Sequence, residues 1–122
     1  MIDHVTIRVK SIGKAKRFYA EALAPLGYKV LSESSGFIGL GEGKEPSFWI
    51  AQEEPLTAAV HLAFRSPDRK KVDAFHAAAL GAGGKDNGKP GVRADYGPSY
   101  YAAFAHDPDG NNIEAVCNKP AK

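Results

Sequence analysis

The chain has 122 residues, of which 43% are hydrophobic and 25% are charged, a composition typical of a single globular domain with a buried core. The net charge is only +2 and no run of five basic residues occurs, so we expect no nucleic-acid partner. No stretch approaches the roughly 18 apolar residues that cross a membrane, and the first residues lack a secretion signal, so we expect no membrane partner. The single cysteine, Cys117, fits a reducing, cytoplasmic location.

The sequence contains an internal repeat. Shifting the chain by 57 positions superposes His4 on His61 and Arg8 on Arg65. The same shift superposes identical residues of two helical patterns, namely Phe18, Ala22, Leu23 and Gly27 on Phe75, Ala79, Leu80 and Gly84. Both patterns place apolar residues at i, i+3 and i+4, which is typical of an amphipathic helix. Before the second helix, Asp68 is well placed to act as the N-cap.

Each repeat unit is predicted to contain a strand, a helix and three further strands. In chain order the predicted strands are 2–9, 28–33, 37–41 and 47–52, and then 60–65, 92–94, 100–106 and 112–117. The Gly- and Pro-rich stretch 83–99 predicts a long loop. We therefore expect an α+β fold of two tandem βαβββ modules, 1–52 and 60–118, joined by a connector at 53–59.

Past the helices the repeat offset becomes 64, because the second unit has the longer loop. This offset pairs Phe37 with Tyr101, Leu40 with Phe104 and Ile50 with Glu114.

Three polar residues are predicted to lie on sheet faces that no helix covers. Side chains of a strand alternate between its two faces, and the apolar set should meet the helix. His4 alternates with Val5, His61 with Leu62, and Glu114 with apolar neighbours in the last strand. If the two modules curve around a shared cleft, His4, His61 and Glu114 can converge there.

Two neutral imidazoles and one carboxylate suit a divalent transition metal with open positions for substrate. The three ligands do not distinguish iron, manganese, zinc and nickel. A single histidine or glutamate on a strand is usually structural or solvent-exposed. The metal hypothesis therefore depends on the repeat-related placement of the two histidines and on the matching face of the glutamate.

Several segments together resemble the vicinal oxygen chelate superfamily, which includes glyoxalase I, bleomycin-resistance proteins, extradiol dioxygenases and fosfomycin-resistance enzymes. They are "DHVTIRV", "VHLAF", "RFYAEALAPLGYKV", "VDAFHAAALGAGG" and, most specifically, "DPDGNNIEAV". The resemblance implies two βαβββ modules around a cleft whose metal is held by the first and fourth strands of each module. Mapped on this chain, those positions are His4, Ile50, His61 and Glu114.

The resemblance also bears on activity. Glyoxalase I has a glutamate where the offset of 64 places Ile50, which cannot bind a metal, so glyoxalase I activity is disfavoured. The remaining His, His, Glu set resembles that of the ring-cleaving dioxygenases and the fosfomycin enzymes. A dioxygenase, lyase or transferase acting on a small oxygen-rich substrate is therefore predicted. A metal-free protein that sequesters a small molecule, like the bleomycin-resistance proteins, is the alternative.

Further residues are candidates for substrate contact. Arg8 and Arg65 share the face of the histidines and could bind a carboxylate or phosphate, although their place at solvated strand ends is the favoured explanation. One of Tyr100 and Tyr101 should point into the cleft, as an acid, a base or a hydrogen-bond donor, or simply for packing. Tyr96 belongs to the long loop and could line the cleft, as could Ile50. Because each module leaves one sheet face open, we also expect a homodimer.

Overall fold

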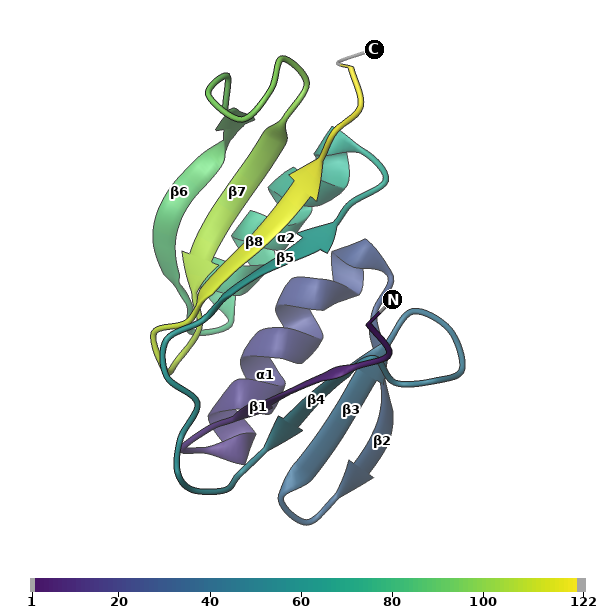
Figure 1. Ribbon diagram of the computed structural model, residues 1–122, viewed down its shortest axis with the longest axis vertical. Coiled ribbons are helices and arrows are strands. Elements are labelled where there is room, and N and C mark those ends of the chain that lie inside the picture. Colours follow the sequence, from purple (N-terminus) through teal and green to yellow (C-terminus); the bar gives the residue numbers. More distant parts are fainter. Residues whose placement is uncertain (1, 121–122) are drawn as a thin grey trace.

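The computed structural model describes residues 2–120, which fold into two modules with the same order of elements. The first module contains β1 (Val5–Arg8), α1 (Ile12–Leu23), the short 3-10 helix η1 (Ala24–Leu26), β2 (Lys29–Ser34), β3 (Phe37–Gly41) and β4 (Phe48–Ala51). The second contains β5 (His61–Arg65), α2 (Arg69–Gly81), β6 (Lys85–Val92), β7 (Tyr101–His106) and β8 (Asn112–Cys117). The α+β fold of two βαβββ modules is thus confirmed (Figure 1).

Each module forms one four-stranded sheet, and the two sheets have equivalent strand orders. The order is β1-β4-β3-β2 in the first sheet and β5-β8-β7-β6 in the second. The first and last strands of a module pair in parallel, and the remaining pairs are antiparallel. Each sheet carries one helix, and α1 and α2 contact each other where the modules meet (Figure 1).

Both helices begin at the side-chain caps that their sequences provide. The Ser11 hydroxyl accepts a hydrogen bond from the backbone N–H of Lys14 at 3.3 Å. The predicted cap Asp68 accepts one from the N–H of Lys71 at 2.8 Å. These bonds satisfy N–H groups that lack a partner within the helix.

Neither α1 nor α2, nor any other helix within residues 2–120, is long and apolar enough to cross a membrane.

One hydrophobic core joins the two modules. It contains the buried stripes of both helices and the helix-facing side chains of both sheets. The rings of Phe48 and Phe64, one from each sheet, lie 5.5 Å apart in an edge-on contact. A buried hydrogen bond crosses the same boundary, from the Tyr19 hydroxyl of α1 to the carboxylate of Asp107 after β7. The opposite side of each sheet, called here its open face, therefore points away from this core.

The stretch 83–99 departs from its prediction. It was expected to be a loop with one short strand at 92–94, but residues 85–92 form β6, paired with β7. The ladder is irregular between Asp86 and Gly88 and again between Gly88 and Gly91. Glycine and proline weaken a strand and mark bulges, so the local sequence resembles a loop although tertiary pairing makes it a strand.

Truncating the central rings should destabilise the protein strongly. Phe18 and Phe75 are both 0% exposed at equivalent places on α1 and α2. Phe18→Ala and Phe75→Ala are each expected to lower the free energy of unfolding by about 3–5 kcal/mol, because a buried cavity replaces the ring. Leu80→Ala on α2 is the control, since Leu80 is 39% exposed and should cost much less. Urea unfolding of the three variants measures this, and equal losses would contradict the assignment of the core.

Candidate metal centre

His61 and Glu114 meet on the open face of the second sheet. They lie on the adjacent parallel strands β5 and β8, where Ala63 is paired with Glu114. Leu62 and Phe64 point toward the core, so alternation turns His61 and Ala63 outward. His61 Nε2 lies 2.7 Å from Glu114 Oε1. The structure thus brings together two of the three predicted ligands.

Glu114 is buried although it lies on the open face. It is 1% exposed, whereas the side chain of His61 is 55% exposed. Tyr100 covers the second carboxylate oxygen, because its hydroxyl donates a hydrogen bond to Oε2. Burying a carboxylate is unfavourable unless its oxygens are hydrogen-bonded, and here both oxygens have a partner. The carboxylate is therefore held in one orientation between an imidazole and a phenol.

Of the two predicted tyrosines, Tyr100 belongs to this cluster and Tyr101 does not. The Tyr101 hydroxyl donates to Asp73 of α2 at 2.6 Å, on the helix side of the sheet. Burial and the adjacent carboxylate of Glu114 together raise the pKa of Tyr100 to about 12. Tyr100 is therefore a protonated hydrogen-bond donor at neutral pH.

His4 lies apart from this cluster. It precedes β1 in the first module, its side chain is 52% exposed, and its Nδ1 lies 2.7 Å from Asp3 Oδ1. Within residues 2–120, no three His, Cys, Asp or Glu side chains are close enough together to hold one ion. Within one chain, His61 and Glu114 therefore lie together and His4 lies apart from them.

The structure corrects the predicted position of Ile50. Ile50 pairs with Ile7, is 0% exposed and belongs to the core, so it lies on the helix side of its sheet. Trp49 pairs with Thr6, just as Glu114 pairs with Ala63 in the second sheet. Because Thr6 and Ala63 are repeat-related, Trp49 and not Ile50 occupies the position equivalent to Glu114.

The error is a shift of one residue, which in a strand moves a side chain to the opposite face. The ring of Trp49 accordingly lies on the open face, over Gly39. A Cβ on Gly39 would lie 2.9 Å from the indole, so only glycine leaves room for the ring there. The consequence for metal binding is unchanged, because tryptophan, like isoleucine, is no ligand.

The remaining predicted residues lie on or near the open faces. Arg8 is partly exposed, with its Nε 3.6 Å from a carboxylate oxygen of Glu53. Arg65 is exposed at the end of β5, on the same side as His61. Tyr96 is 67% exposed, and its ring centre lies 5.1 Å from that of Tyr100. Of this group, Tyr96 therefore extends the cluster around Glu114.

Two further residues complete the cluster and were not predicted. The ring of Phe104 in β7 lies 6.1 Å from that of His61, and Phe104 pairs with Glu114 in the ladder. The guanidinium carbon of Arg93 lies 5.4 Å from the centre of the Phe104 ring. Alternation in strand 100–106 could have placed Phe104 on this face. Arg93 lay inside the predicted strand 92–94, but nothing in the sequence indicated which side of that short strand would lie on the open face.

A groove of about 570 Å³ lies elsewhere, between α1, the end of α2 and the turn from β7 to β8. It is lined by Lys14, Arg17, Ala82, Gly83, Lys85, His106, Asp107, Pro108 and Gly110. Neither His61 nor Glu114 contributes to it. The chemical groups of the open face are therefore a separate feature of the molecule.

Comparison with known proteins agrees with this architecture. Two βαβββ modules with a polar cluster on an open sheet face define a glyoxalase-like fold. The profile of the Glyoxalase/Bleomycin resistance protein/Dioxygenase superfamily matches residues 1–115, and the chain belongs to this superfamily. No match was found among curated proteins.

Solved structures give the same result over the whole chain. A glyoxalase/bleomycin resistance protein from Albidiferax ferrireducens T118 is 29% identical, with a TM-score of 0.80 over 97% of this chain and 98% of that one. A glyoxalase/bleomycin resistance protein/dioxygenase family enzyme from Burkholderia phytofirmans PsJN is 20% identical, with a TM-score of 0.75 over 97% and 98%. A lactoylglutathione lyase from Agrobacterium tumefaciens is 14% identical, with a TM-score of 0.70 over 96% and 92%. The last two show a shared fold only.

The corrected register can be tested with two adjacent substitutions. Ile50→Glu would bury a carboxylate without a partner and should prevent folding or lower stability by several kcal/mol. Trp49→Glu places the same group on the open face, so the protein should remain folded with a smaller loss. Circular dichroism and urea unfolding compare the two variants. A stable Ile50→Glu protein beside an unfolded Trp49→Glu protein would restore the original assignment.

Proposed function

We propose that the protein is a metal-dependent enzyme that acts on a small oxygen-rich substrate, with a divalent ion held by His4, His61 and Glu114. The observation that carries this proposal is the buried carboxylate of Glu114, fixed beside an imidazole on a sheet face that is otherwise open. Glutamates are rarely buried even when their oxygens are hydrogen-bonded, so a buried carboxylate beside an exposed imidazole is a candidate functional group. When bound, a divalent ion would polarise substrate oxygens as a Lewis acid.

The geometry of His61 and Glu114 fits a shared ion. Donor atoms that bind one ion at about 2.0–2.2 Å stand roughly 3 Å apart. The 2.7 Å between His61 Nε2 and Glu114 Oε1 requires only a small separation to meet this. His61 is also accessible, since more than half of its side chain is exposed. A nitrogen and an anionic oxygen together suit a divalent transition metal.

The third ligand, His4, would come from a second copy of the chain. In its own chain His4 is exposed, and its Nδ1 is close enough to the Asp3 carboxylate to donate a hydrogen bond. A proton on Nδ1 leaves the lone pair of Nε2 free for a metal, and a carboxylate at the other nitrogen is the usual companion of a metal-binding histidine. A homodimer that places the open face of one first module against that of its partner's second module would complete the site.

The chain's own residues would then bind and orient the substrate. Tyr100 holds its proton at neutral pH and can donate a hydrogen bond either to Glu114 or to a developing oxyanion. Arg8 and Arg65 lie on the two open faces, where they could reach a substrate carboxylate or phosphate. Tyr96, exposed beside Tyr100, would cover one side of the ligand.

The ligand set bears on the reaction class. Trp49 stands where a second glutamate would complete four protein ligands, so the proposed site has three and leaves more positions for substrate oxygens. This favours dioxygenase, lyase or transferase chemistry over that of glyoxalase I. The large indole on the open face also favours a second candidate function, which is metal-free binding of an aromatic or apolar small molecule.

Replacing Glu114 by Gln should separate these two functions. The substitution removes the anionic ligand at nearly constant size, so metal content after purification without chelators should fall well below that of the parent. Thermal unfolding of the metal-free variant should remain cooperative, because the core lies on the other side of the sheet. Glu53→Gln, at an exposed carboxylate, is the matched control and should keep full metal content.

Unchanged metal occupancy in Glu114→Gln, or a parent protein that binds no divalent metal, would favour the binding-protein function instead.

The shared site predicts complementation between two defective variants. In mixed dimers of His4→Ala and Glu114→Gln, one site would be intact and the other would lack both ligands. Refolding the two variants together should therefore restore metal to about a quarter of all sites, if the chains pair at random. Metal analysis of the mixture measures this, with sedimentation to confirm the dimer. Monomers at micromolar concentration, or a mixture with no recovered metal, would contradict the shared site.

A further inference from the structure

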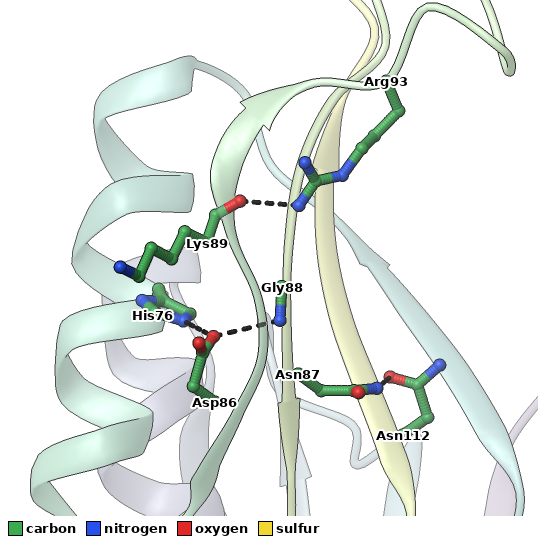
Figure 2. A network of polar contacts seen from close by, with 7 residues as sticks. All are labelled: His76, Asp86, Asn87, Gly88, Lys89, Arg93 and Asn112. Carbon is green, nitrogen blue, oxygen red and sulfur yellow. Dashed lines mark hydrogen bonds and ion pairs between the residues drawn. The ribbon is translucent and has the colours of Figure 1, made fainter.

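Strand β6 contains a bulge that helix α2 holds in place. Asp86 Oδ1 accepts a hydrogen bond from the backbone N–H of Gly88 at 3.0 Å. The same oxygen lies 2.9 Å from Nε2 of His76, whose side chain is only 10% exposed on α2. Figure 2 shows His76 and Asp86 on the helix side of β6, and Arg93 on the other side. The bulge is therefore fixed from beneath the sheet.

The bulge leaves space on the open face for two side chains. Gly88 has a φ of +154°, a backbone conformation that L side chains rarely adopt. A Cβ at Gly88 would lie 2.8 Å from Cδ1 of Phe104 and 3.1 Å from Nη2 of Arg93. The absence of a side chain at Gly88 lets the ring and the guanidinium lie against the sheet.

Arg93 is held in a defined position without a carboxylate. Its Nη2 donates to the backbone carbonyl of Lys89 at 2.6 Å, as Figure 2 shows, and its guanidinium lies over Phe104. Its backbone N–H donates to the carbonyl of Tyr100 at 2.7 Å, which ties Arg93 to the residue that covers Glu114. No carboxylate of residues 2–120 forms an ion pair with Arg93. Its positive charge is thus oriented and uncompensated.

We propose that Arg93 recognises an anionic group of the ligand, a carboxylate or a phosphate, on the same open face as His61 and Glu114. A guanidinium presents a planar fork of N–H donors that matches such groups, and the bonds to Lys89 and Phe104 fix its orientation in advance. This inference rests on the proposed function only in placing the anion beside the proposed metal site. It assigns the substrate to the small organic acids or phosphate esters, with the acidic group next to Phe104.

Nuclear magnetic resonance can test this on the protein as purified. Inorganic phosphate and malonate are titrated separately at constant ionic strength, and the backbone N–H signals around residue 93, which every variant keeps, are followed together with the Nε–H signal of Arg93 where it is present. A saturable shift with one or both anions is expected. Arg93→Gln should weaken that binding by about tenfold or more, since bonds between charged groups are lost. Arg17→Gln is the matched control, since it removes the same charge from an exposed position on α1. It should bind the anion as the parent does.

Two further variants make the result decisive. Arg93→Lys keeps the charge but loses the planar set of N–H donors, so it should bind the anion several-fold more weakly. This variant provides the test if Arg93→Gln does not fold. Glu114→Gln should still bind the anion, which would separate this inference from the proposed metal site. Undiminished binding in the Arg93 variants, binding lost only in Glu114→Gln, or no saturable shift with either anion would overturn the proposal.

Discussion

One helix can cover only one face of a sheet, and this constraint shapes the whole molecule. Each module has a four-stranded sheet and a single long helix, and the two helices contact each other inside a common core. Both sheets consequently keep one face free of helices. The cluster of His61, Tyr100 and the buried carboxylate of Glu114 is found on one of these faces and not in the groove beside the helices. The fold thus places the core on one side of each sheet and leaves the other side free for the proposed recognition of a ligand.

Much of this separation could be predicted from sequence. The strand bounds 37–41 and 112–117 agree with the structure, the cap at Asp68 is confirmed, and alternation placed His61 and Glu114 on the face away from the helix. These features depend on local pattern, because helix caps, helix periodicity and strand alternation are set by neighbouring residues. The choice between Tyr100 and Tyr101 needed only the phase of one strand, which the structure supplies.

The features that the sequence did not predict depend on contacts between distant residues. The repeat offset of 64 selected Ile50 because insertions in loops leave the register undetermined, and one residue is enough to reverse the face. Strand β6 was not predicted because its glycines resemble a loop. They suit a bulge that Asp86 stabilises together with His76 of the neighbouring helix α2. The position of His4 relative to His61 depends on how two modules, or two chains, are arranged, and no spacing within the sequence encodes that.

Trp49 occupies the position at which the other module has a carboxylate, and this has a consequence for the orientation of a bound ligand. The two modules are related by approximate symmetry, so a cleft with equivalent halves would accept a molecule in either direction. In the proposed cleft, one half would present the carboxylate of Glu114 and the other the broad indole of Trp49, which favours apolar or aromatic surface. An asymmetric molecule between two such faces would have a single favoured direction, with its oxygens toward one module and its hydrocarbon toward the other. Loss of internal symmetry would in this way give the cleft a polarity.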